Sequence, residues 1–183
     1  MTDFEPILRD ANRRLSTELR TAGRSAWSAD VDDRQFEVLD LAVSYVEDED
    51  VPVGLAEVLG TAPLIVRDRV YAVDGRRVCW ARSYLPAEFA EHKPIGRLDT
   101  GPGGTPARLA ELGHALVTFA EDVEFVEREY VAGGERGKLG LDGAAGVVLV
   151  ERRSSDASGR VVEVTDMRMV ASVYRFRWGW ASR

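Results

Sequence analysis

The chain has 183 residues with a formal net charge of −7, of which 45% are hydrophobic and 30% are charged. This length predicts one main domain with a substantial core, and the acidic balance argues against a nucleic-acid-binding surface, which must be basic. The single cysteine, Cys79, excludes an internal disulfide framework and indicates a reducing cytoplasm. Neither a signal peptide nor an apolar run of about 18 residues is visible, so we expect no membrane segment.

The first third of the chain predicts a helix followed by a strand. Apolar residues recur every three to four positions over residues 4–21, and Gly23 can end that helix. Its arginines could contact nucleic acid, but interspersed Asp10 and Glu18 favour a solvated face. A strand is expected over residues 35–46, with a bulge near Asp40 where the apolar phase changes. The acidic run 47–50 could bind a cation, yet its spacing favours a solvated loop before a short helix over 52–59.

The most informative stretch is a predicted hairpin over residues 64–90. Two runs rich in β-branched and aromatic residues flank Asp74-Gly75, a dipeptide suited to a tight turn. Arg67 and Arg69 then share one face of the first strand, together with Tyr71. They could bind an anion, or they could be solvated charges paired with nearby carboxylates.

The register of this hairpin is open at the level of sequence. A turn made of Asp74-Gly75 alone would place Arg67 opposite Arg82. A loop one residue longer would place it opposite Ser83, which suits a ligand site better.

A glycine-rich segment, residues 99–106, precedes the next predicted helix over residues 106–112. Thr105 stands where an N-cap is expected and Pro106 at the first helical position, and such helix starts can bind phosphate. The segment matches neither a Walker nor a dinucleotide motif, so it is a weak nucleotide signal. His114, just beyond the helix, is interpreted as structural rather than catalytic.

The remaining chain predicts mostly strands. One is expected over residues 116–130, then a short helix within 133–141, a hairpin with strands over 146–153 and 160–171, and a last strand over 173–180. Hairpin-linked strands with few short helices indicate an α+β protein with antiparallel pairing.

Four motifs together carry a family resemblance. In order they are R-x-R-x-x-x-x-D-G-x-x-V-x-x-A-R-S-Y-L-P from Arg67, G-G-T-x-x-x-L-x-E-L-G from Gly103, D-A-S-G-R-V-V-E-V from Asp156, and V-Y-R-F from Val173. The set resembles a UTRA domain, the effector-binding domain of HutC-type GntR-family transcription regulators. The likeness covers roughly residues 35–178, which divides the chain into an N-terminal helix and linker (1–34) and a UTRA-like ligand-binding domain (35–183).

The resemblance implies a chorismate-lyase-like fold, with a roughly six-stranded antiparallel sheet, flanking short helices and a pocket for a small, often anionic effector. It also implies a homodimer. No metal-binding constellation is visible in the sequence, and we expect no cofactor. The ligand-binding residues implied by position, or by an apolar extension of the same faces, are Arg67, Arg69, Trp80, Ser83, Tyr84, Thr105, Glu163, Thr165, Met167 and Tyr174. Trp80 and Met167 could equally belong to the core.

Two function classes remain open. The first is a non-catalytic effector-binding domain of a regulator, which would not bind DNA itself because too few residues precede Phe4 to hold a winged helix-turn-helix. The second is a stand-alone lyase, isomerase or cyclase of natural-product biosynthesis, in which Glu163, Tyr84 or Tyr174 would be the general acid or base. The first is the favoured hypothesis.

Overall fold

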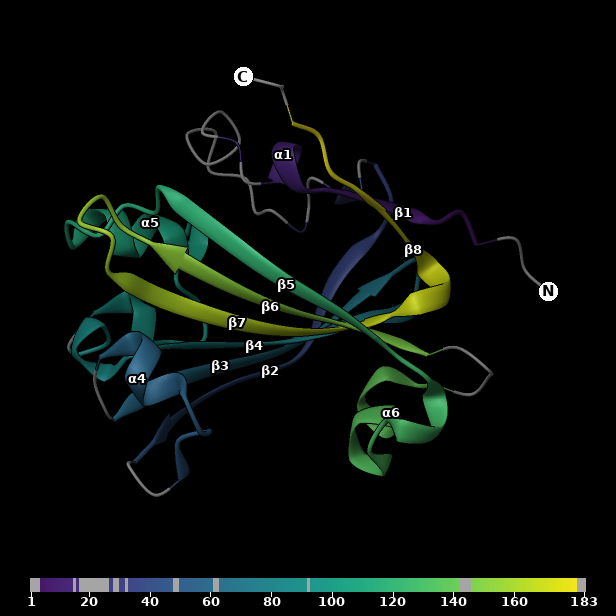
Figure 1. The fold of residues 1–183 in the computed structure, drawn as a ribbon, viewed down its shortest axis with the longest axis horizontal. Helices are drawn as coiled ribbons and strands as arrows, with labels where there is room; N and C mark the ends of the chain where they lie inside the picture. Colours follow the sequence, from purple (N-terminus) through teal and green to yellow (C-terminus); the bar gives the residue numbers. More distant parts are fainter. Residues whose placement is uncertain are drawn as a thin grey trace.

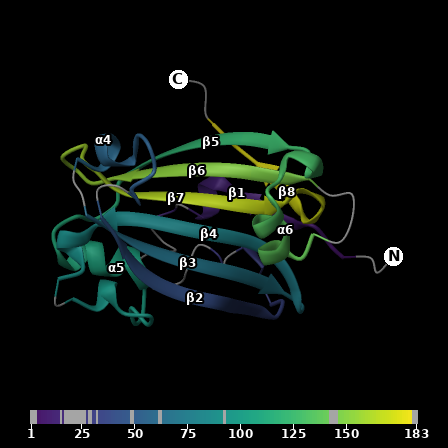
Figure 2. The ribbon, with the colours of Figure 1, turned by 90° about the horizontal axis from the view of Figure 1, so that it is seen from below.

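A strongly bent, six-stranded antiparallel sheet forms the body of the molecule (Figures 1 and 2). The computed structural model describes residues 4–14, 16, 27, 30–31, 33–47, 50–60, 63–91, 93–141 and 146–180. In sheet order the strands are β2 (Phe36–Val46), β3 (Leu64–Val73), β4 (Arg76–Pro86), β7 (Val161–Val170), β6 (Val147–Ser155) and β5 (Thr118–Val126). The predicted α+β class with six antiparallel strands is therefore confirmed.

The N-terminal segment differs from the prediction. Residues 7–10 form strand β1 (Ile7–Asp10), which pairs in parallel with β8 (Tyr174–Arg177), and only α1 (Ala11–Arg14) is helical there. The helix predicted over residues 4–21 is thus wrong at its start, while residue 15 and residues 17–21 lie outside the described part. Ile7 and Arg9 are buried together, an alternation of two that suits a strand. The backbone of β8 provides the partner, which a local pattern of apolar residues cannot reveal.

Short helices cover both faces of the sheet (Figure 1). On one face lie α5 (Gly104–Glu111) and the β1–β8 pair; on the other lie α4 (Leu55–Leu59) and α6 (Gly133–Leu139). Leu109 of α5 packs with Ile65 and Leu85, whereas Leu59 of α4 packs with Tyr84. Single 3-10 turns occupy Ala87–Phe89, Pro94–Gly96, Arg128–Tyr130 and Ala171–Val173. Within the described part of the chain, no helix has the length and apolar character that a bilayer crossing requires.

In the central hairpin Arg67 lies opposite Ser83, the register that suits a ligand site. A bulge in β4 produces this register, and not the longer loop that the sequence suggested. Asp74 and Gly75 form the turn with φ values of 50° and 74°. Arg67 nevertheless lies opposite Ser83, because a bulge at Val78 inserts one residue into β4. The expected bulge near Asp40 is also present, as a register shift between Leu39 and Ala42.

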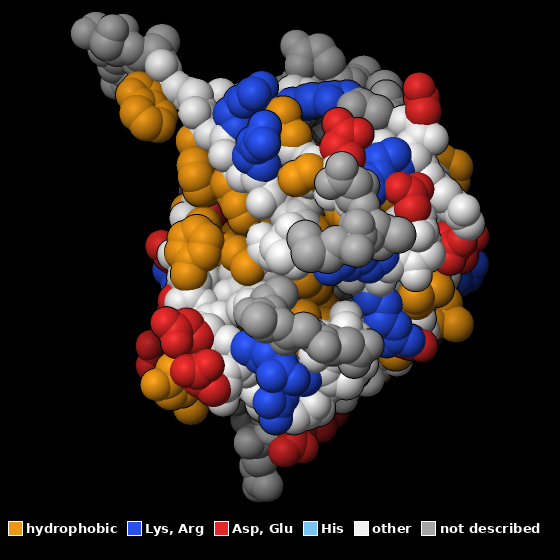
Figure 3. Space-filling model, turned by 90° about the vertical axis from the view of Figure 1, so that its right-hand side faces the viewer, with side chains coloured by type: hydrophobic (Ala, Val, Ile, Leu, Met, Phe, Trp, Pro, Cys, Tyr) orange, Lys and Arg blue, Asp and Glu red, His pale blue; other side chains and the backbone are white. Residues whose placement is uncertain are grey.

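Figure 3 shows the side of the molecule on which β8 and α6 lie. Hydrophobic, basic and acidic side chains lie interspersed on this face, and no single charge dominates it. In β8 and beyond, Phe176 stacks on Trp178 with ring centroids 5.7 Å apart. Arg9, almost fully buried, lies 5.6 Å from the centre of the Phe176 ring and also pairs with Glu121 of β5, so it connects the β1–β8 pair to the six-stranded sheet.

Candidate functional site

A cavity of about 760 Å³ lies between the bent sheet, α5 and the N-terminal segment. Its volume suits a small metabolite, since ligand pockets commonly measure about 300–1,000 Å³. Of the residues predicted to bind a ligand, the cavity is lined by Arg67, Arg69, Ser83, Thr105, Glu163 and Thr165. Five of these come from β3, β4 and β7, whose alternate side chains face this side. The structure thus gathers them around one hollow.

Arg67 fastens the loop that borders the cavity. Its guanidinium donates hydrogen bonds to the backbone carbonyls of Ile95 (2.8 Å), Arg97 (2.5 Å) and Leu98 (2.8 Å). Burial, reinforced by neighbouring Arg69, lowers the pKa of Arg67 to about 10, so the group stays charged at neutral pH. Most of its donors are already used, and its main role is therefore to position this loop.

Arg69 is only weakly hydrogen-bonded within the described structure. Its contacts with the Tyr71 hydroxyl (3.3 Å) and the Ser83 hydroxyl (3.4 Å) are long. Its Nε is buried and, within the described structure, has no partner. Ser83 in turn shares a 3.0 Å hydrogen bond with Thr165. An acceptor in the cavity would complete the hydrogen bonding of Arg69.

Glu163 and Arg152 face each other across β7 and β6. Nη2 of Arg152 lies 3.4 Å from the Glu163 carboxylate, and the Ser154 hydroxyl lies 3.5 Å from it, so both contacts are weak. Glu163 is only 3% exposed. The Nε of Arg152 is buried without a partner among the described residues. Arg152 was not among the predicted residues, although alternation after Val148 and Val150 would have placed it on this face.

The N-terminal segment supplies an aromatic wall and a further arginine. Trp27 stacks on Tyr71 at 4.3 Å between ring centroids, and Phe36 stacks on Tyr71 at 5.5 Å. Arg14 lies over the Trp27 ring at 4.5 Å and donates a 2.6 Å hydrogen bond to Asp30. These residues, except Asp30, line the cavity. No local motif pointed to Arg14 or Trp27, because only the folded chain brings them over the sheet.

The start of α5 forms another part of the wall, but with a different cap from the one predicted. The N-cap is Gly103, with φ of 79°, and Thr105 is already helical and makes no side-chain capping bond. The prediction of Thr105 as the N-cap is therefore wrong. A positive φ suits glycine, which allows the helix to begin two residues earlier than expected. Thr105 still lines the cavity and is 5% exposed.

Four of the predicted ligand-binding residues lie outside this cavity: Trp80, Tyr84, Met167 and Tyr174. Trp80 and Tyr84 point to the opposite face of the sheet, where Trp80 contacts Lys138 and Tyr84 packs near α4. Met167 and Tyr174 belong to the core around the β1–β8 pair. Glu163, Tyr84 and Tyr174 consequently do not form one catalytic group. Burial raises the pKa of Tyr174 well above its usual value.

The model of the UTRA domain matches residues 38–175. This chain belongs to the UTRA domain family. No curated protein matches its sequence. Among solved structures, it is similar to PhnF from Mycobacterium smegmatis, with 20% identity over 97% of this chain and 73% of that chain and a TM-score of 0.74. The effector domain of the same PhnF shares 19% identity over 96% of this chain and all of that chain, with a TM-score of 0.72.

A transcriptional regulator from Streptomyces coelicolor shares 22% identity over 82% of this chain and 96% of that chain, with a TM-score of 0.59. The chain spans 64% of the length of a protein described as a GntR-family transcriptional regulator. These likenesses show the chorismate-lyase-like fold of such effector domains, which is the fold that the resemblance implied.

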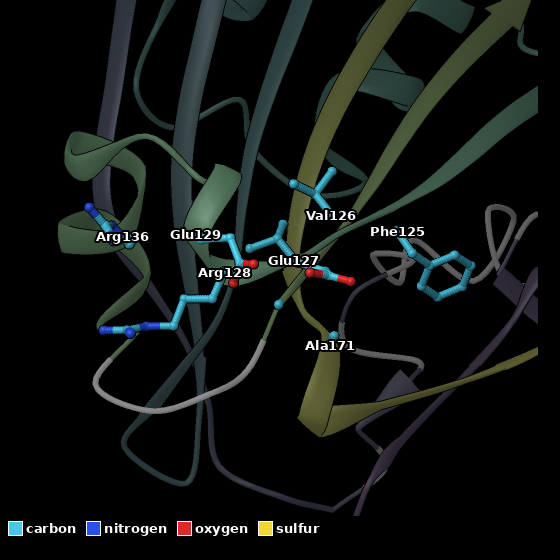
Figure 4. A pocket seen from close by; sticks show the side chains of 9 residues that line it. Phe125, Val126, Glu127, Arg128, Glu129, Arg136 and Ala171 are labelled. Atoms are coloured by element: carbon cyan, nitrogen blue, oxygen red, sulfur yellow. The ribbon is translucent and has the colours of Figure 1, made fainter.

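A second hollow of about 640 Å³ opens on the UTRA domain near the end of β5 (Figure 4). Its wall mixes Glu127 and Glu129 with Arg128 and Arg136, and Phe125 at its edge is 70% exposed. Among the described residues that line it, none has a buried side-chain polar atom without a partner. The hollow beside Arg69 is therefore the better candidate site of this UTRA domain.

His114 of the UTRA domain has a structural partner. Its Nδ1 lies 2.7 Å from the Asp156 carboxylate, and its ring packs against Phe89 at 4.8 Å. Hydrogen bonds from the Ser158 hydroxyl and from His114 hold the pKa of Asp156 well below its usual value. This contact joins the end of α5 to the β6–β7 turn, and His114 does not line the cavity.

Proposed function

We propose that this UTRA domain binds a small anionic metabolite with an apolar part in the cavity, as the effector-binding domain of a HutC-type GntR regulator. The observation that carries the proposal is Arg69, whose buried Nε has no partner among the described residues while its side chain lines a metabolite-sized hollow. The effector domains among the structural neighbours support the regulatory role.

The charge inside the cavity is opposite to that of the chain as a whole. Four arginines line it, Arg14, Arg67, Arg69 and Arg152, against two carboxylates, Asp99 and Glu163, whereas the chain carries a net charge of −7. A buried donor without a partner costs free energy, and an anion would remove this cost while making charge-assisted hydrogen bonds. The lining of the cavity therefore carries more positive than negative charge.

An apolar part of the ligand is supported by the aromatic wall. Trp27, Tyr71 and Phe36 form a continuous stack along one side of the cavity. Flat aromatic surfaces bind apolar or cyclic groups, so a ligand with a ring or chain beside its anionic group would contact both regions.

Ligand binding can be transmitted through the loop at residues 95–98, which Arg67 attaches to the sheet. An anion beside Arg69 would lie next to Arg67 and would favour one arrangement of this loop. We propose that the domain works as a homodimer in which such a shift changes how two copies are oriented. The resemblance of the motifs to HutC-type UTRA domains, which implies a homodimer, supports this proposal.

The experiment measures binding of inorganic phosphate and of benzoate by calorimetry to the wild type and to Arg69→Gln. We expect Arg69→Gln to bind these anions about ten- to a hundred-fold more weakly, because a hydrogen bond to a charged group contributes about 1.5–3 kcal/mol. Arg153→Gln is the matched control, since Arg153 is exposed on β6 and paired with Glu151. Equal anion binding by wild type and Arg69→Gln would refute the proposal.

A further inference from the structure

We propose that Arg14 and Arg152 form a second anion-binding subsite in the same cavity, so that the natural ligand carries two anionic groups. This inference rests on the proposed function and names the ligand class: a dianion such as a dicarboxylate or a phosphorylated carboxylic acid.

The second subsite lies three strands away from β3, the strand that carries Arg67 and the first subsite's Arg69. Arg67 pairs with Ser83, Ser83 with Thr165, and Thr165 with Arg152, on four neighbouring strands. With strands about 4.8 Å apart, the backbones of Arg67 and Arg152 are separated by about 14 Å. The side chains of both line the cavity, and the hydroxyls of Ser83 and Thr165 lie between them.

The second subsite has hydrogen-bonding capacity that the described residues do not use. The Arg14 side chain is 1% exposed, and it uses Nη1 for Asp30 while Nε and Nη2 are buried without a partner in the described structure. The Nε of Arg152 is buried and without a described partner as well. These two arginines line the same hollow.

The carboxylates near the second subsite pair only in part with Arg14 and Arg152. Part of the positive charge of these two arginines is therefore available to a ligand. Glu121 is bound by Arg9, and Asp30 by Arg14 through one oxygen. Glu163 approaches Arg152 no closer than 3.4 Å, which is a weak contact. Two guanidinium groups that repel each other and are incompletely paired favour a further anion between them.

The test compares dicarboxylates with monocarboxylates of equal carbon number by calorimetry: succinate with butyrate, adipate with hexanoate, and suberate with octanoate. We expect at least one dicarboxylate to bind the wild type about ten-fold or more tightly than its monocarboxylate. Arg152→Gln and Arg14→Gln should each reduce this preference to about two-fold or less, because they weaken dicarboxylate binding more than monocarboxylate binding, whose anion lies on Arg69. Arg69→Gln should weaken binding of both kinds of probe.

The variants have matched controls. Arg153→Gln, on the neighbouring position of β6 but exposed, should keep the preference for dicarboxylates. If Arg14→Gln fails to fold because Asp30 is left unpaired, the pair Arg14→Gln/Asp30→Asn removes both charges, and Arg152→Gln tests the subsite independently.

The outcomes distinguish a failure of the second subsite from a failure of the proposed function. A wild type that binds carboxylates through Arg69 with no preference for dicarboxylates would overturn the second subsite and leave the proposed function standing. The same holds if the preference survives in Arg152→Gln and in the Arg14 variants. If no anion, phosphate included, binds the wild type, the proposed function fails and the second subsite fails with it.

Discussion

At the scale of single residues, neighbouring positions on one strand face have different roles. Arg67 and Arg69 both point into the cavity, as their alternation predicts. The sequence could not show that the loop at residues 95–98 returns to accept three hydrogen bonds from Arg67. That loop is distant in the chain, and its backbone carbonyls leave no pattern in the side chains. Arg69 instead makes two long hydrogen bonds, to Tyr71 and Ser83, and its Nε has no partner among the described residues.

Asp30 makes stability depend on pH. Burial raises its pKa from 3.8 to about 6, and the attraction of Arg14 offsets only part of this. The folded chain therefore binds this proton more tightly than the unfolded chain, so the free energy of unfolding falls as pH rises from about 4 to about 6. A shift of about two pKa units corresponds to about 3 kcal/mol.

The comparison of Asp30→Asn with the wild type isolates this effect. The free energy of unfolding of the variant, relative to the wild type, should rise by up to about 3 kcal/mol between pH 4 and pH 6, as measured by urea denaturation. The other charged groups that act on Asp30, namely Arg14, Arg9, Arg13 and Glu121, are common to both proteins. A difference that stays constant over this interval would contradict the prediction.

At the scale of elements, alternation predicted the strands well and local signals predicted their irregularities less well. The hairpin turn at Asp74-Gly75 and the bulge at Asp40 are confirmed. The bulge at Val78 was not predicted, because an apolar residue there continues the pattern of β4 without interruption. The start of α5 was placed too late because Gly103, at a positive φ, replaces the expected Thr105 cap.

Gly75 gives a direct test of the turn. Its φ is 74°, and a Cβ built there meets nothing within 4 Å, so Gly75→Ala changes only the backbone cost. We expect this variant to lose about 1 kcal/mol of unfolding free energy. Gly137→Ala is the control: Gly137 lies inside α6, its Cβ would also be unobstructed, and alanine should stabilise by about 0.5–1 kcal/mol. Thermal unfolding that ranks the two variants in the opposite order would refute this account.

At the scale of the whole molecule, the pairing of strands distant in the chain determines the structure of the N-terminal residues, which the local sequence pattern did not predict. The N-terminal residues were predicted as a helix, yet β1 pairs with β8 and is tied to β5 by the ion pair of Arg9 with Glu121. This arrangement brings Arg14 and Trp27 to the cavity, and their part of the candidate site was therefore invisible in the sequence. The residues on β3, β4 and β7 were predictable, because the hairpin motifs determine their faces.

Breaking the Arg9–Glu121 ion pair should lower the free energy of unfolding of the whole domain. Arg9 is 1% exposed at its side chain and Glu121 is 9% exposed, so Arg9→Gln leaves a buried carboxylate without its partner. We expect a loss of about 3 kcal/mol in unfolding free energy and faster amide exchange in β1. Adding Glu121→Gln should restore most of the stability. Arg153→Gln breaks the exposed pair of Arg153 and Glu151 and gives the comparison. If Arg9→Gln loses no more unfolding free energy than Arg153→Gln, the buried pair contributes little.

The stacking of Trp27 on Tyr71 gives the domain an internal optical probe. Trp27 is the tryptophan that lines the cavity, while Trp80 lies on the far face of the sheet and Trp178 near the chain end. A molecule entering beside Arg14 would change the surroundings of the indole directly. Emission from this ring therefore offers a label-free signal of occupancy, once phenylalanine has replaced the other tryptophans.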